Sequence, residues 1–142
     1  MQAARPIPTP MQTNIRLQKD VSPAMHDPSM FHSVVGALQS ILITHPKFSY
    51  AVNNICQFMH NPQEYHWKVV KCILRYIVGT SSHGLLIQHS PTTQICAFND
   101  ADWGSDIDDR KSTTGYYVYY KLNIIAWSSH KQRVVLRSIT KA

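Results

Sequence analysis

Five aspartates lie within ten positions of the sequence, and their residue type and spacing suit them to metal chemistry. Hydrolysis of a phosphodiester by two divalent ions requires carboxylates that hold the ions about 3.5–4 Å apart. Aspartates are also common in turns, because the side chain accepts hydrogen bonds from nearby backbone amides. The residue types therefore leave a metal site and an acidic turn both open. The cluster supplies five of the eight acidic residues of the chain: Asp100, Asp102, Asp106, Asp108 and Asp109.

Two members of this cluster are the stronger candidates for metal binding. The apolar run 95–98 (ICAF) predicts a core strand, and Asp100 comes two residues after it, at the end of that strand. Asp102 lies two residues further along and would point to the same face if the strand continues. We therefore name Asp100 as a candidate metal ligand and Asp102 as a weaker one. The other three aspartates are expected in a loop, as turn and ion-pair residues.

Other familiar sites do not fit the sequence. A calcium-binding loop opening at Asp100 would need Gly and Glu where Ser105 and Lys111 stand. The three cysteines lie far apart and form no CxxC pair, which indicates neither a zinc site nor a disulfide scaffold. The phosphate-binding motifs GxxxxGK(S/T) and GxGxxG and the serine motif GxSxG are also absent. No small-molecule substrate is evident.

The composition indicates which class of partner and which cellular compartment to expect. The 142 residues carry a formal net charge of +6, which favours polyanionic partners. No apolar run approaches the ~18 residues of a membrane span, so we expect no membrane partner. The odd number of cysteines indicates a reducing, intracellular environment, without distinguishing cytoplasm, nucleus and organelle.

Helices followed by strands are expected to position the candidate residues, which indicates an α+β protein. Residues 1–27 are rich in Pro, Thr, Gln and Asn and predict an extended linker or arm. Helical spacing of apolar residues in 28–80 predicts three helices, the third opened by Asn61 as N-cap with Glu64 in a capping box. Four short runs in 84–142 predict antiparallel strands: GLLIQ, QICAFND, GYYVYY and NIIAWSS.

The third predicted helix carries a row of basic residues. Lys68, Lys71 and Arg75 are spaced three and four apart and therefore share one flank of the helix. Such a row is either a solvated helix face or a surface that contacts phosphates along a duplex. The candidate partner is an RNA–DNA or DNA duplex.

Two long motifs resemble copia-like retrotransposon polyproteins. The stretch 31–80, which begins FHSVVGALQSILITH, is similar to the thumb and connection region that follows the polymerase palm. The stretch 98–120, FNDADWGSDIDDRKSTTGYYVYY, resembles the opening of the ribonuclease H domain. The resemblance runs from about residue 9 to residue 140. It implies that 28–80 is a thumb- or connection-like segment and that 84–142 holds the first strands of a partial ribonuclease H-like antiparallel sheet.

The resemblance also implies roles for individual residues. Asp100, the first aspartate of NDADW, matches the first metal-binding carboxylate of the ribonuclease H site, and Asp102 belongs to the same motif. The intact domain uses Mg²⁺. The family pattern continues to a second catalytic glutamate, and Lys141 stands at that position here. A lysine there would repel metal ions. The helical match favours phosphate contacts by the basic row.

We therefore expect a non-catalytic remnant of a reverse transcriptase/ribonuclease H polyprotein, with no cofactor. The polymerase palm and the later catalytic acids are missing from this sequence. An incomplete sheet would also leave an unpaired edge and an apolar face in water. Two alternatives stay open. One is a residual nucleic-acid-binding module that uses the basic helix face. The other is a hybrid-specific ribonuclease that is active only when complemented by the missing C-terminal part.

Overall fold

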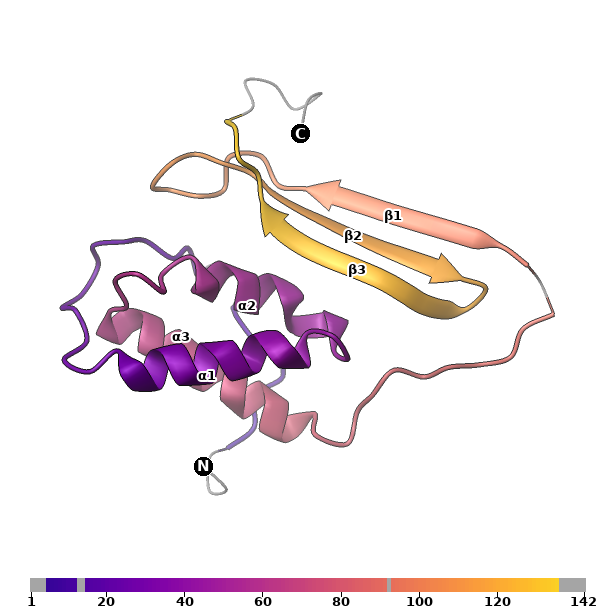
Figure 1. The fold of residues 1–142 in the computed structure, drawn as a ribbon, viewed down its shortest axis with the longest axis horizontal. Coiled ribbons are helices and arrows are strands. Elements are labelled where there is room, and N and C mark those ends of the chain that lie inside the picture. Colours follow the sequence, from indigo (N-terminus) through magenta and orange to yellow (C-terminus); the bar gives the residue numbers. More distant parts are fainter. Residues whose placement is uncertain (1–4, 13–14, 92, 136–142) are drawn as a thin grey trace. The chain divides into compact units, whose positions relative to one another are not determined.

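The chain divides into two compact units, Met1–His83 with the helices and Gly84–Ala142 with the strands (Figure 1). The computed structural model describes residues 5–12, 15–91 and 93–135. This order of helices and then strands is compatible with an α+β fold. In the described residues, no helix is long and apolar enough to cross a membrane.

Three α-helices and one short 3-10 helix build the first unit: α1 (Ser29–Ile41), η1 (Pro46–Phe48), α2 (Ser49–Cys56) and α3 (Glu64–Gly79). Each α-helix turns one apolar stripe inward, as the helical spacing of its apolar residues requires. The stripes meet in one core that excludes water, because its central side chains are completely buried: Phe31, Val35, Val52, Ile55, Val70 and Ile73.

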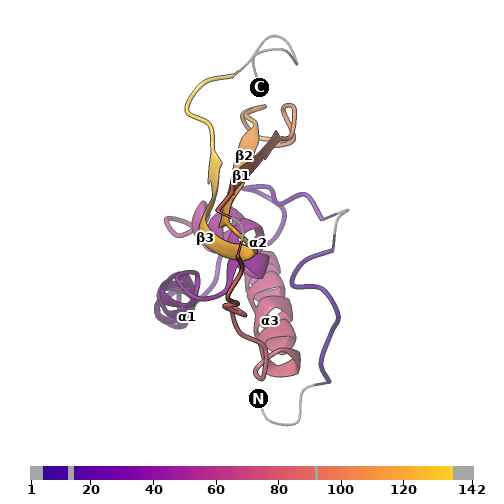
Figure 2. The same ribbon diagram turned by 90° about the vertical axis from the view of Figure 1, so that its right-hand side faces the viewer.

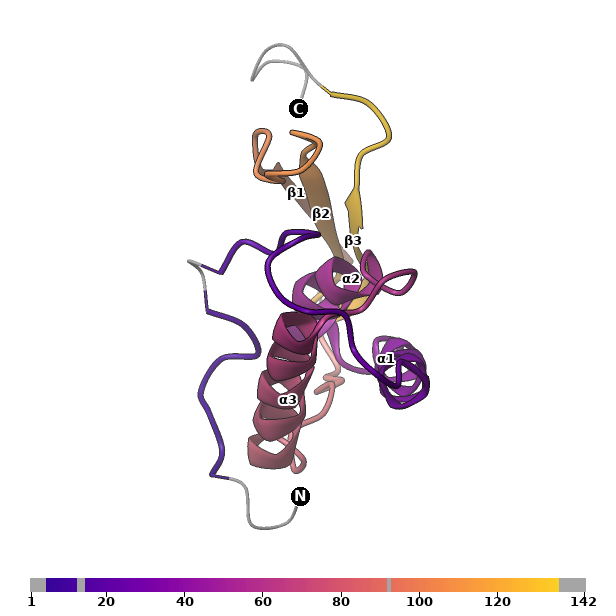
Figure 3. The same ribbon diagram turned by 90° about the vertical axis from the view of Figure 1, so that its left-hand side faces the viewer.

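The N-terminal arm packs against one side of the helical core. Leu17 belongs to the buried core, and Ile7, Met11 and Ile15 pack against that core. The arm then pairs with the chain just before α3, where the Glu64 amide donates to the carbonyl of Pro23 at 3.1 Å. In two views at right angles to Figure 1, the arm runs beside α3 (Figures 2 and 3). Apolar contacts therefore order a segment that composition alone marks as a linker.

The start of α3 differs from the expected capping box. The N-cap is Gln63, and the residue that completes the box is His66. The Gln63 amide donates to His66 Nδ1 at 3.1 Å, so the ring proton lies on Nε2, which is 2.9 Å from the carbonyl oxygen of Gln18. Gln63 Oε1 also accepts the amides of Val21 and Ser22. The arm therefore determines where this helix begins.

Three antiparallel strands form the sheet of the second unit, in the order β1-β2-β3. They are β1 (Ile95–Ala101), β2 (Thr113–Tyr120) and β3 (Asn123–Lys131), and β2 and β3 are joined by two residues. Phe98 lies opposite Tyr117, which lies opposite Trp127, so one row of aromatic side chains crosses the sheet. The register slips by one residue after Val118, which leaves Ile125 as a bulge in β3.

The predicted strand GLLIQ does not form. Residues 84–91 contain no strand in the structure. The amide of Gln88 donates to the side-chain oxygen of Asn123 at 2.6 Å, and the Asn123 side chain donates back to the Gln88 carbonyl at 2.8 Å. A side chain thus satisfies the backbone groups that a partner strand would otherwise bind.

Candidate functional site

Asp100 stands in β1, opposite Gly115 of β2. It is exposed to solvent, and its Oδ1 accepts the amide of Ala101 at 2.9 Å. Because side chains alternate along a strand, it shares a face with Phe98. The strand therefore presents this carboxylate at the surface.

Asp102 follows the end of β1 and closes the loop between β1 and β2. Its Oδ1 accepts the amide of Thr113 at 2.7 Å, and its Oδ2 accepts the hydroxyl of Ser105 at 2.6 Å. The loop is further tied by the Gly104 amide, which donates to Ser112 Oγ at 3.0 Å. Both oxygens of Asp102 are thus engaged in fixing the loop.

Asp106 and Asp109 act as turn and ion-pair residues, as the sequence predicts. Asp106 Oδ1 accepts the amides of Asp108 and Asp109 at 2.9 and 3.2 Å. The Lys131 ammonium lies 2.6 Å from Asp106 Oδ2 and 3.0 Å from Asp109 Oδ1. One lysine from β3 therefore neutralises two carboxylates of the loop.

The charges of this ion cluster stabilise one another. Burial raises the pKa of Asp109, but hydrogen bonds from Lys131 and from the Lys111 amide outweigh it and hold that pKa below its ordinary value. Burial lowers the pKa of Lys131, and its bonds to Asp106 and Asp109 outweigh that effect, so the net pKa is raised. Both partners are charged at neutral pH.

The magnesium site implied by the family resemblance does not fit the described residues. They contain no group of three or more His, Cys, Asp or Glu side chains that could hold a metal ion. Both oxygens of Asp102 already accept hydrogen bonds that hold the loop. Lys141, at the position of the second family carboxylate, lies outside the described residues.

The basic residues of α3 differ in their surroundings. Lys68 and Lys71 are exposed, and Lys71 Nζ lies 5.6 Å from the centre of the Trp67 ring, a cation–π distance. Arg75 is half-buried, and its Nε donates to the carbonyl oxygen of Arg5 at 2.8 Å. The arm thus engages one of the three basic groups, while the two lysines face solvent.

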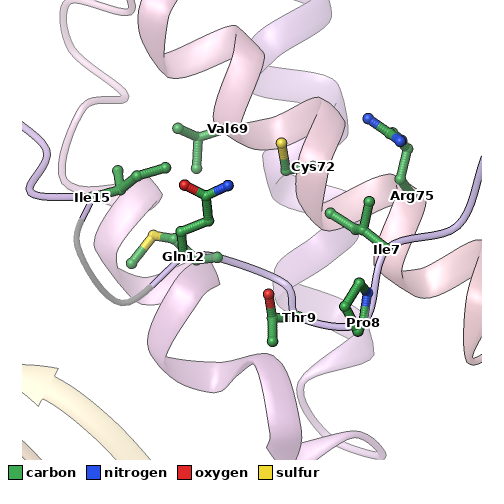
Figure 4. A pocket seen from close by; sticks show the side chains of 9 residues that line it. Ile7, Pro8, Thr9, Gln12, Ile15, Val69, Cys72 and Arg75 are labelled. Carbon is green, nitrogen blue, oxygen red and sulfur yellow. The ribbon is translucent and has the colours of Figure 1, made fainter.

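A cavity of about 270 Å³ lies between the arm and α3 (Figure 4). Sequence reasoning missed it, although Ile7, Met11 and Ile15 recur every four residues in the arm, a spacing that marks one apolar side. The walls are mainly apolar, which suits them to an apolar group rather than a phosphate. The lining residues are Ile7, Pro8, Thr9, Met11, Gln12, Ile15, Val69, Cys72 and Arg75.

The chain is similar along its whole length to proteins of transposons. It is 43% and 44% identical over 142 residues to the retrovirus-related Pol polyproteins from transposons RE2 and RE1 of Arabidopsis thaliana. It covers about a tenth of the length of each of these relatives. It is also 43% identical over 138 residues to an uncharacterised mitochondrial protein of Arabidopsis thaliana, of which it covers 57%.

Comparison with family models and with solved structures adds no further relative. No family model matches the chain, and no solved structure matches it. The full-length similarity to the transposon polyproteins covers both the helices and the strands. The chain therefore belongs to the family of copia-like retrotransposon Pol polyproteins.

Proposed function

We propose that this chain is a non-catalytic remnant of a reverse transcriptase/ribonuclease H polyprotein. In this proposal, the helical unit corresponds to a thumb- or connection-like segment and the strand unit to the opening of a ribonuclease H-like sheet. The observation that carries it is how the aspartates are used. Asp102, Asp106 and Asp109 bind loop amides, a hydroxyl and Lys131, which leaves Asp100 as the strand-borne carboxylate facing solvent. Two-metal hydrolysis requires several carboxylates around the ions.

A cleavage assay tests the lack of catalysis. The purified chain is incubated with an RNA–DNA hybrid and Mg²⁺ or Mn²⁺, beside an Asp100→Asn variant and a matched Asp108→Asn control in the loop. We expect the same background signal from all three proteins. Cleavage that persists in Asp108→Asn and disappears in Asp100→Asn would contradict the proposal. Adding the C-terminal segment of a relative tests whether complementation restores activity.

A second candidate function is nucleic-acid binding through α3. Lys68 and Lys71 are exposed on one flank of the helix, and residues 1–83 carry seven basic and three acidic side chains. A positive helix flank suits contact with phosphates, which is independent of sequence and sensitive to salt. The proposal is limited to these two lysines, because Arg75 already donates to the arm.

Fluorescence anisotropy at several salt concentrations tests this binding. Each phosphate contact contributes about −0.9 to the slope of log K against log salt on duplex DNA. The double variant Lys68→Gln/Lys71→Gln is therefore expected to lower the magnitude of the slope by about 2. Lys47→Gln changes an exposed lysine of η1, outside α3. It is the matched control and should leave the slope nearly unchanged. Salt-independent affinity of the unmodified chain would eliminate this candidate.

A further inference from the structure

The outer edge of β1 carries backbone hydrogen-bonding groups that β2 does not engage, and one of them, the Ala101 amide, donates to Asp100 Oδ1 at 2.9 Å. β1 is an outer strand of the sheet and, among the described strands, pairs only with β2. The amide of Asp102 donates to Thr113, directly opposite, and the carbonyl of Gln94 accepts the amide of Lys121, also directly opposite. Hydrogen-bonded pairs alternate in an antiparallel ladder, so even-numbered residues of this strand face β2. The odd-numbered residues therefore direct their amides and carbonyls outward: Ile95, Ala97, Asn99 and Ala101.

This edge lacks the sequence features that usually prevent an edge strand from pairing with another strand. β1 contains no proline, lysine or bulge, and its one charged residue is Asp100. Ile95 is 69% exposed and Phe98 is 62% exposed. The opposite edge differs, because β3 is bent by the bulge at Ile125. Unprotected edge strands of this kind recruit further strands.

We propose that β1 pairs with β1 of a second copy of this chain, antiparallel, about a two-fold axis at Phe98. In this register Ile95 lies opposite Ala101 of the other copy, and Ala97 lies opposite Asn99. All four outward-facing residues of each copy then form hydrogen-bonded pairs, and the Ala101 amide exchanges its bond to Asp100 Oδ1 for one to the second copy. A shift of two residues in either direction would leave some of these groups unpaired. The two three-stranded sheets join into one continuous sheet.

The side chains support this register. Phe98 meets Phe98 of the second copy across the axis, on the face where its ring already lies 6.0 Å from the ring of Tyr119. The pairing withdraws a mostly exposed aromatic side chain from water. Asp100 lies opposite Cys96 of the second copy, so the two anionic carboxylates do not face each other. Neither the charge nor the shape of the strand opposes self-association.

Sedimentation of the 142-residue chain tests the association. We expect a concentration-dependent dimer. Phe98→Lys places two ammonium groups at the axis and should weaken dimerisation by at least tenfold. Ile125→Lys makes a similar change on the β3 edge, where the side chain is 56% exposed, and should leave the dimer intact. Circular dichroism establishes that both variants fold. A monomer at every concentration, or assembly into open polymers, would overturn the proposal.

Cysteine cross-linking tests the register independently. All three native cysteines are replaced by serine, and a single cysteine is introduced. At the axis, facing Cα atoms of a non-hydrogen-bonded pair lie about 4.5 Å apart, within the range of a disulfide. Phe98→Cys should therefore give a covalent dimer with diamide as oxidant. Asn99→Cys, which faces Ala97 of the second copy, should not. Efficient cross-linking of Asn99→Cys, or none by Phe98→Cys, would overturn the register.

Discussion

The helical unit buries its apolar side chains, whereas the strand unit displays them. Phe31, Val52 and Ile73 are completely buried between three helices and the arm. Among the described residues of the three strands, Ser129 alone is buried, and Phe98 is 62% exposed. The hydrophobic effect therefore stabilises the first unit directly. The second unit depends more on its backbone ladder and on the polar contacts of its loop.

The largest effect is expected from a cavity in the helical core. Ile73→Ala removes buried methyl and methylene groups of α3 and should lower the free energy of unfolding by about 2–5 kcal/mol. Ile125→Ala is the matched control, because this side chain is 56% exposed, and should change stability by less than about 0.5 kcal/mol. Urea denaturation measures both. Equal losses of unfolding free energy in the two variants would show that burial of apolar side chains does not distinguish the helical unit from the strand unit.

A smaller effect is expected from the loop that holds the strand unit together. Asp102→Ala removes the acceptor for the Thr113 amide and the Ser105 hydroxyl and should destabilise this unit by about 1.5–3 kcal/mol. Hydrogen exchange should accelerate in residues 102–113 more than in α3. Ile107→Ala is the control within the same loop, because this side chain is 38% exposed. If both variants behave alike, the loop does not depend on Asp102.

The contact between the arm and α3 is expected to have a smaller, local effect, which is measured as the rate of amide hydrogen exchange in the arm. A Cβ added at Gly79 would lie 2.9 Å from Cβ of Pro6. Two carbon atoms cannot stay this close, so the arm or the end of α3 must shift. Gly79→Ala should therefore speed exchange in residues 5–12 several-fold while the buried core of α3 stays protected. Gly36→Ala in α1 is the control, because no atom outside the adjoining backbone of its own helix lies within 4 Å of the added Cβ. Unchanged exchange in the arm would show that this contact is not required.

The same contrast explains what could be predicted from the sequence. Apolar spacing predicts the helices and three of the four expected strands, because periodicity reports which side chains face a core or share a sheet face. Apolar spacing does not predict a feature that depends on residues far away in the sequence. The side chain of the N-cap Gln63 accepts the amides of Val21 and Ser22, which lie 42 and 41 residues away in the sequence.

The candidate site was predicted only in part for the same reason. A cluster of aspartates is visible in the sequence, and the family motif identifies Asp100 and Asp102 within it. The role of Asp102 depends on Thr113, 11 residues further on, which meets it only after the strands pair. Spacing alone therefore could not separate a metal ligand from a residue that closes a loop.

The smallest predicted effect is the pH dependence of the ion cluster. The pKa of Asp109 is lower in the folded chain than its ordinary value of 3.8, so its contribution to stability is present above about pH 4 and is lost as the pH falls through the lowered value. The pKa of Lys131 is raised above 10.5, so its contribution is present below that pH and is lost as the pH rises through the raised value.

Comparison of the chain with Lys131→Met from pH 2 to pH 12 measures this contribution. The difference in unfolding free energy should be constant between about pH 5 and pH 10 and should shrink outside that range. It should be small, because the side chains of Lys131 and Asp109 are 21% and 32% exposed and water screens the pair. A difference in unfolding free energy that persists at pH 2 would mean that Lys131 stabilises the strand unit by packing its alkyl chain. The strand unit would then depend less on polar contacts than the comparison with the helical unit implies.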